Sequence, residues 1–273
     1  MEDHFYFKNK SEKELFGVIH YPEEGSFKGV LICQPIFEEK LHVHRVLVDF
    51  SRLLSSAGFT AMRFDYYGDG DSEGEFEEAT VKSRLSDINL ALDFFKKKTS
   101  IQKVALLGVR FGATLAALSA EEEKEVDALI LWAPILKGND YLHQLLRMNL
   151  THQVVVYKKV LYTREDLIKG VKEGKKINVE GYEISKGLYE QVSEVNLLTQ
   201  DKSFSGKTLF FQFSQNKAEI DPGLEKLRNL YSKNNFSEIL KSSDPPFWGD
   251  MKYYPTCTPD LFEKSLNWLK ANL

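Results

Sequence analysis

The segment Gly108-Val109-Arg110-Phe111-Gly112 places a charged residue between two glycines, where an apolar strand is expected to turn directly into a helix. Such an elbow pushes its central side chain into a cleft, and the flanking residues must be small to allow the strained geometry. In a catalytic elbow the central residue is a nucleophile. Arg110 cannot take that role, because a guanidinium stays protonated and is neither a nucleophile nor a general base.

Two hypotheses follow for Arg110. It would lie beside the N-terminus of the predicted helix, where backbone N–H groups and the helix dipole favour negative charge. The first hypothesis is therefore a site for an anion, such as a carboxylate or phosphate on an acyl or sugar ligand. The second is that Glu38 or Glu39, in the loop after an apolar strand, pairs with Arg110 and closes the site, because a buried guanidinium without a partner is costly. If a ligand displaced the glutamate from Arg110, both hypotheses would hold.

The ligand-binding residues predicted around this site come from three parts of the chain. They are Phe37, Glu38, Glu39, Arg110, Phe111, Phe247 and Trp248. The aromatic residues near the C-terminus fit either the wall of a pocket or a core beneath a lid. These aromatic residues are Phe247, Trp248, Tyr253 and Tyr254.

Other reactive residue types do not assemble into a recognisable site. His42 and His44 form an H-x-H pair, but no third metal ligand is evident, and we expect solvated turn histidines. Cys257 has no positive neighbour and no apparent base, so we expect a free loop thiol. No metal, no cofactor and no conventional catalytic residue is predicted.

The glycine-rich stretch from Asp65 to Gly74 has three interpretations. Its glycine spacing and its acidic residues do not fit a phosphate-binding loop. A calcium loop starting at Asp69 would have Thr80 at its twelfth position, where a bidentate carboxylate is needed. The favoured interpretation is a structural turn that leads to the next helix.

Apolar, β-branched runs alternate along the chain with stretches of helical periodicity. The predicted strands span 15–21, 29–35, 59–66, 103–109, 128–134, 208–214 and 238–243. The predicted helices span 44–57, 80–95, 111–120 and 259–273. This rhythm indicates an α/β fold with crossover connections, in which helices flank a mostly parallel central sheet.

The alternation stops after Pro134 and resumes at Thr208. The intervening segment has amphipathic helical patterns, and Glu180-Gly181 predicts a hairpin turn within it. An insertion between two strands commonly covers the carboxyl edge of such a sheet, where ligands bind. We therefore predict a core formed by residues 1–134 and 206–273, and a helical lid formed by residues 135–205.

The composition excludes several classes of protein. The chain has 273 residues, with 36 Lys and Arg against 40 Asp and Glu and a formal net charge of -4, so nucleic-acid binding is not expected. No apolar run approaches the roughly 18 residues of a membrane span. No secretion signal is visible, and two cysteines make no disulfide scaffold. We expect a cytoplasmic protein whose partner is a small molecule, with its oligomeric state open.

The elbow, the glycine-rich loop, the lid and the sheet rhythm together resemble the α/β-hydrolase superfamily over nearly the whole chain. The resemblance implies a Ser, Cys or Asp nucleophile at the elbow, followed by an acid and then a histidine. The acid would fall near Lys217, with Glu219 and Asp221 close by. All six histidines lie at or before position 152, and Asp244-Pro245-Pro246-Phe247-Trp248 stands where the histidine loop is expected.

Four short motifs indicate a closer resemblance: PIFEEK, GVRFG, LWAPILKG and PPFW. They are similar to the hydrolase-like proteins of bacterial exosortase and exopolysaccharide loci. More specifically, they resemble the second type of exosortase A system-associated hydrolase-like protein, in which the elbow also carries Arg. The resemblance implies a bacterial source and a link to polysaccharide export or sorting, but no particular reaction.

The sequence thus predicts an α/β-hydrolase-fold protein without a Ser-Asp-His triad. We expect it to bind a small acyl or sugar ligand in a lidded cleft at Arg110, and under the first hypothesis for Arg110 this ligand is an anion. One alternative is a hydrolase of esters, thioesters or peptides, with Arg110 stabilising an oxyanion and Glu38 or Glu39 acting as the base. The adjacent Arg110 disfavours this role, because a nearby cation lowers the pKa of a carboxyl group and so makes the carboxylate a weaker base. Another alternative is a protein–protein adaptor that uses the lid surface.

Overall fold

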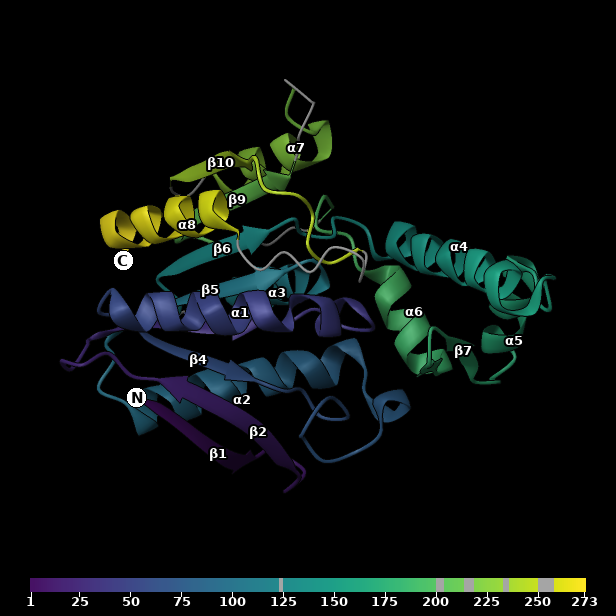
Figure 1. Ribbon diagram of the computed structural model, residues 1–273, viewed down its shortest axis with the longest axis horizontal. Coiled ribbons are helices and arrows are strands. Elements are labelled where there is room, and N and C mark those ends of the chain that lie inside the picture. The colour runs from purple at the N-terminus through teal and green to yellow at the C-terminus, as the bar shows by residue number, and fades with distance from the viewer. Residues whose placement is uncertain (123–124, 200–203, 214–218, 233–235, 250–257) are drawn as a thin grey trace.

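A central sheet of eight strands organises the computed structural model, which describes residues 1–122, 125–199, 204–213, 219–232, 236–249 and 258–273 (Figure 1). The strand order is β1-β2-β4-β3-β5-β6-β9-β10. The strands are β1 (Glu2–Lys8), β2 (Glu14–His20), β3 (Lys28–Cys33), β4 (Thr60–Phe64), β5 (Lys103–Val109), β6 (Ala128–Trp132), β9 (Lys207–Phe213) and β10 (Ser237–Ser242). Strand β2 pairs antiparallel with β1 and with β4, and the remaining pairs are parallel, so the predicted mostly parallel sheet is confirmed.

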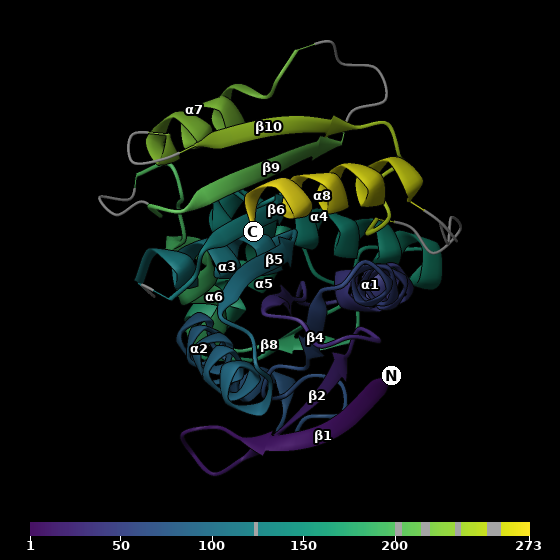
Figure 2. The same cartoon turned by 90° about the vertical axis from the view of Figure 1, so that its left-hand side faces the viewer.

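Helices cover both faces of this sheet (Figure 2). The flanking helices are α1 (Glu39–Ser56), α2 (Val81–Lys98), α3 (Phe111–Glu122), α7 (Pro222–Tyr231) and α8 (Pro259–Asn272). Helices α1 and α8 bury their apolar stripes against one face, and α2, α3 and α7 bury theirs against the other. The central strands are buried on both sides, which explains why they read as continuous apolar runs in the sequence.

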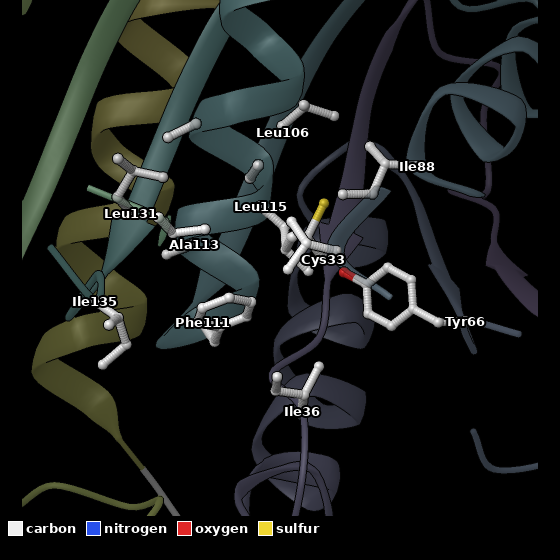
Figure 3. Close-up of a cluster of buried hydrophobic side chains, with 14 of the residues drawn as sticks. Cys33, Ile36, Tyr66, Ile88, Leu106, Phe111, Ala113, Leu115, Leu131 and Ile135 are labelled. Carbon is white, nitrogen blue, oxygen red and sulfur yellow. The ribbon is translucent and has the colours of Figure 1, made fainter. Parts of the chain in front are cut away.

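Strand β5 shows how the core supports the elbow that follows it. Its alternate side chains enter the two apolar clusters, with Leu106 on one face and Leu107 on the other. Around Leu106 the cluster contains Cys33, and the hydroxyl group of Tyr66 points toward its sulfur atom (Figure 3). Burial raises the pKa of the Cys33 thiol to about 12, so this cysteine is not an available nucleophile.

Three elements differ from the sequence predictions, and one of them is helix α7, which was not predicted. The chain begins with β1, which was not predicted, because this edge strand is mostly exposed and buries only Phe7 among its seven residues. Helix α1 begins at Glu39 rather than at residue 44, so its first turn includes Glu39 and His42. The apolar stripe of α1 starts only at Val43, and the first turn therefore carries no periodic signal.

Five elements lie between β6 and β9, and we call Gly138–Glu194 the insertion. They are α4 (Gly138–Tyr157), α5 (Arg164–Lys172), β7 (Ile177–Val179), β8 (Tyr182–Ile184) and α6 (Lys186–Glu194). The predicted hairpin is present, with Glu180 and Gly181 both at positive φ between β7 and β8. The insertion lies beyond the carboxyl ends of the parallel strands (Figure 1).

The insertion is packed firmly onto the core at its base. The ring of Tyr182 meets the rings of Phe37 and Phe76 edge to face, at centroid distances of 5.9 and 4.9 Å. Helices α4 and α6 cross so closely that a Cβ atom on Gly138 would lie 1.7 Å from the carbonyl oxygen of Val192.

In the part of the chain that the structure describes, no helix is long and apolar enough to cross a membrane.

The carboxylates of the glycine-rich loop are engaged with cations of the protein. Asp69 forms an ion pair with Arg84, whose side chain is fully buried between the rings of Tyr66 and Phe76. Asp65 pairs with Lys40 at 2.8 Å. These contacts favour the structural turn over the calcium loop among the interpretations of this stretch.

Candidate functional site

The elbow after β5 has the strained geometry that its glycines predict. Arg110 has a φ of +53°, a left-handed conformation that costs a side-chain-bearing residue about 1–2 kcal/mol. Its N–H group donates to the carbonyl of Trp132 at 2.9 Å, and its own carbonyl accepts from Ala113 as α3 begins. A Cβ atom on Gly108 would lie 2.3 Å from Cα of Ala113, so the strand and helix approach each other too closely for any other residue.

Glu39 is the partner of Arg110. The guanidinium Nε donates to Oε1 of Glu39 at 2.9 Å, and both side chains are only 12% exposed. The hydroxyl group of Tyr141, on α4 of the insertion, donates to Oε2 of Glu39 at 3.0 Å. The three residues therefore connect the elbow, the first turn of α1 and the insertion through one carboxylate.

Burial dominates the electrostatics of this group. It raises the pKa of the Glu39 carboxyl, while Arg110 and the Tyr141 hydroxyl act in the opposite direction. Burial also raises the pKa of Tyr141 well above its usual range, and the charge of Glu39 adds to this effect. Tyr141 is therefore protonated at neutral pH, which lets it donate the hydrogen bond to Glu39.

The aromatic residues predicted for the site have different roles. The ring of Trp248 lies over Arg110, with 5.0 Å between the guanidinium carbon and the ring centroid, which stabilises the cation. Phe111 is fully buried and stacks on the ring of Tyr141, at 5.5 Å between centroids. Phe247 is also buried, edge to face with the ring of Trp132. Tyr253 and Tyr254 lie outside the described residues.

A pocket of about 110 Å³ opens beside this group, between the core and the insertion. Its apolar wall consists of Phe37, Leu145, Met148, Val179 and Trp248. Its polar residues are Glu38, Glu39, His42, Tyr141, Gln144 and Glu180. The volume suits a small chemical group or one end of a larger ligand.

His42 is a residue of this pocket that the sequence analysis placed wrongly. It was predicted to be a solvated turn histidine, but it lies in the first turn of α1 and its side chain is 9% exposed. Because the Trp248 carbonyl can only accept, Nδ1 of His42 carries the hydrogen that bridges their 2.9 Å separation. Its Nε2 is buried without a hydrogen-bond partner among the described residues and lies 3.9 Å from the carboxylate of Glu38. His44, two residues later, is exposed.

Glu180 contributes a second buried polar atom to the pocket. One of its carboxylate oxygens pairs with His152 on α4, and the other is buried with no hydrogen-bond partner in the described part of the chain. The backbone of Glu180 has a φ of +52°, and that of Phe37, on the opposite wall, has a φ of +59°. Together with Arg110, three residues in or beside the pocket hold a strained backbone, which is more common at functional sites than elsewhere.

The two acidic side chains near the predicted position of a triad acid lie in different surroundings. Asp221 caps the N-terminus of α7, where its side chain accepts from the N–H group of Leu224 at 2.9 Å, and Glu219 is exposed. Lys217 and Cys257 lie outside the described residues. Within the described ranges, no cluster of three or more His, Cys, Asp or Glu side chains is placed to hold a metal ion.

Comparison with known families gives one match that covers most of the chain. Residues 40–214 match the family described as "Serine aminopeptidase, S33". A shorter match is to an uncharacterized protein of Rickettsia prowazekii (strain Madrid E), 26% identical over 106 residues. That match covers 38% of this chain and 43% of the Rickettsia protein, which is less than half of each.

Solved structures of esterases resemble this fold over its full length. An esterase of Pyrococcus furiosus has a TM-score of 0.67 and 15% identity, and the match covers 100% of this chain and 91% of that one. Est1E from Butyrivibrio proteoclasticus, with ferulic acid bound, has a TM-score of 0.65 and 16% identity, covering 98% and 96%. These likenesses confirm the predicted α/β-hydrolase fold.

Proposed function

The chain belongs to the S33 serine aminopeptidase family of α/β-hydrolase-fold proteins, and from this premise we propose that it is a member without a Ser-Asp-His triad. In this proposal the protein binds a small ligand in the pocket beside Arg110, and the insertion serves as its lid. The observation that carries the proposal is the ion pair between Arg110, at the nucleophile position, and Glu39. The elbow keeps its strained geometry, but its side chain holds a carboxylate rather than attacking a carbonyl.

Three further features support the absence of a triad. No histidine follows position 152 in the sequence, so none can stand in the loop after β10. That loop instead brings Trp248 over Arg110. Asp221, one of two acidic residues close to the acid position predicted near Lys217, is engaged as a helix cap. The nucleophile and histidine positions therefore carry residues with other roles, and Lys217 lies outside the described residues.

We expect no serine-hydrolase activity in standard assays. A fluorophosphonate probe should not label the protein, and p-nitrophenyl esters should not turn over above the buffer rate, because no activated hydroxyl or thiol lines the pocket among the described residues. Arg110→Ser should also remain inactive, since a new hydroxyl would have no base arranged as in a triad. An active α/β-hydrolase esterase serves as the positive control.

The opposite result would favour the alternative of an unconventional hydrolase. Turnover by the wild type that is abolished by Arg110→Ala or by Glu39→Ala would establish it, because those residues would be the oxyanion stabiliser and the base. The raised pKa of Glu39 is one property that such a base needs. However, both oxygens of Glu39 already accept hydrogen bonds from Arg110 and Tyr141.

The free polar atoms of the pocket favour a ligand that donates hydrogen bonds. Within the described ranges, Nε2 of His42 and one oxygen of Glu180 are buried without partners, and both can accept. Glu38 adds a third acceptor to the lining of the pocket. The charge of Arg110, by contrast, is matched by Glu39, so an anion would have to displace that carboxylate. Of the ligands considered, a sugar hydroxyl or a hydroxylated acyl group fits better than an anion.

Thermal shift measurements with matched variants test this ligand class. We expect hydroxyl-rich sugars to raise the melting temperature of the wild type, because they satisfy the unpaired acceptors. The shift should be lost in His42→Phe and kept in His44→Phe, whose histidine is exposed on the same helix. Carboxylates or phosphates that stabilise the wild type but not Arg110→Ala would instead support the anion site and would contradict the hydroxyl ligand.

We also propose the narrower classification that the motifs indicate. Arg110 in GVRFG, together with PIFEEK, LWAPILKG and PPFW, supports membership in the second type of exosortase A system-associated hydrolase-like proteins. This classification brings with it a bacterial source and a link to polysaccharide export or sorting. A sugar ligand in the pocket would agree with that link. The neighbourhood of the gene in its genome is the direct test.

A further inference from the structure

The free end of the insertion exposes an unusual amount of apolar surface. We call residues 154–162, which include the last turn of α4 and the loop after it, the apolar tip. Its large apolar and aromatic side chains are 43% to 61% exposed: Val154, Val155, Val156, Tyr157, Val160, Leu161 and Tyr162. Exposed apolar residues that stand singly are normal, but a contiguous patch marks a surface that contacts something else.

Hydrogen bonds hold the apolar tip in this outward arrangement. Gln153 is almost fully buried, and its side-chain oxygen accepts from the N–H groups of Leu161 and Tyr162, at 2.7 and 3.0 Å. Its side-chain nitrogen donates to the carbonyl of Tyr162 at 3.2 Å and to Asn149 at 2.8 Å. The loop is thus tied to α4 through its backbone, so its side chains project away from the protein rather than inward.

The segment of sequence that contains the apolar tip has a charge of opposite sign to that of the whole chain. From residue 147 to residue 176 there are eight Lys and Arg but only three Asp and Glu, whereas the whole chain has a net charge of -4. Lys158 and Lys159 lie inside the tip itself, both exposed, and neither forms an ion pair with a described residue. A surface that combines exposed apolar side chains with unpaired lysines is complementary to an anionic lipid bilayer, in which an apolar layer lies beneath negatively charged headgroups.

We propose that the apolar tip inserts into the surface of an anionic phospholipid bilayer. Valine, leucine and tyrosine side chains would enter the interface between headgroups and acyl chains, and Lys158 and Lys159 would contact the phosphates. A second copy of the chain fits the tip less well, because two tips face to face would bring their unpaired lysines together. The tip is also at one end of the long axis of the molecule, where the core does not obstruct a flat surface (Figure 1).

Docking in this way would bring the pocket close to the lipid. Helix α4 contributes Tyr141, Leu145 and Met148 to the pocket wall and ends in the tip. Met148 and Val155 are seven residues apart, or about 10 Å along the helix axis.

Binding to the bilayer does not depend on which ligand the pocket takes, so its test is independent of the proposed function.

Flotation with vesicles tests the proposal directly. We expect the full-length protein to float with phosphatidylglycerol–phosphatidylcholine vesicles, to bind pure phosphatidylcholine at least about tenfold more weakly, and to dissociate in about 0.5 M NaCl. Val155→Ser/Tyr162→Ser and Lys158→Glu/Lys159→Glu should each weaken binding about tenfold or more. Phe27→Ser is the matched control, because Phe27 is 62% exposed but lies outside the insertion, and it should bind as the wild type does.

Several outcomes would overturn the proposal. One is a wild type that does not float with anionic vesicles, and another is binding that the two tip variants leave unchanged. A third is a dimer, measured by light scattering without vesicles, that the tip variants dissociate, because a second copy would then cover the tip. Melting curves of the variants should match the wild type, since every substituted side chain is exposed.

Discussion

Gly112→Ala is expected to destabilise the protein by about 3 kcal/mol or more. A Cβ atom at this position would lie 2.3 Å from the carbonyl oxygens of both Cys33 and Gln34. These are backbone atoms at the end of β3, so no side-chain rotation can relieve the overlap. Helix α3 would have to move away from the sheet, and Arg110 with it. Urea unfolding of the wild type and the variant measures the difference.

Gly170→Ala is the matched control for this substitution. Gly170 lies inside helix α5, and the atom nearest to a Cβ there would be Cγ2 of Ile177 at 3.7 Å, an ordinary contact. Alanine favours a helix over glycine, so this variant should gain about 0.5–1 kcal/mol. The same chemical change should therefore have opposite signs at the two positions. A Gly112→Ala protein that unfolds at the same urea concentration as the wild type would contradict the close approach of α3 and β3.

Arg110→Ala should cost about 3 kcal/mol of stability, because it leaves the carboxylate of Glu39 buried without its cation. Only the hydrogen bond from Tyr141 would remain to that carboxylate. The loss should be larger at high pH than at low pH. Burial already raises the pKa of Glu39, and removing Arg110 raises it further, so acidification lets the variant neutralise the group by binding a proton. Urea unfolding at about pH 5 and pH 8 measures both effects.

A second substitution separates the lost ion pair from lost packing. Glu39→Gln in the Arg110→Ala background should recover part of the stability and should remove the pH dependence, because glutamine is uncharged and can still accept from Tyr141. Alanine is preferable to glycine at position 110, since glycine would also relieve the strain of the positive φ. An Arg110→Ala variant whose stability equals that of the wild type at both pH values would show that Glu39 does not depend on this cation.

Much of the fold could be predicted from local patterns. Strands such as β5 and β6 are uninterrupted apolar runs because they are buried on both faces, and this pattern is visible without a structure. The glycines at 108 and 112 indicate the elbow, because only a close approach of strand and helix requires them. Elements whose sequence carries little apolar periodicity were missed. Strand β1 is one example, and the first turn of α1 is another.

Local patterns were least informative about the residues that meet at the site. Glu38 and Glu39 are neighbours in the sequence and both were candidates for Arg110, but successive residues of a helix point about 100° apart. Only Glu39 is directed at the guanidinium, whereas Glu38 lies 3.9 Å from His42. The role of His42 depends on the carbonyl of Trp248, which is 206 residues away in the chain. No spacing within the sequence indicates such a contact.

The sequence by itself determined which chemistry is available: a permanent cation at the elbow, no histidine after position 152, and a chain that alternates strands and helices. These are properties of residue type and local order, which do not depend on how distant segments meet. Only the tertiary structure decided that the cation is neutralised by Glu39, 71 residues away, and that Tyr141, 102 residues from Glu39, completes the group. The physical reason is that a buried charge takes whichever partner the path of the backbone brings within hydrogen-bonding distance, and that path is a property of the whole fold.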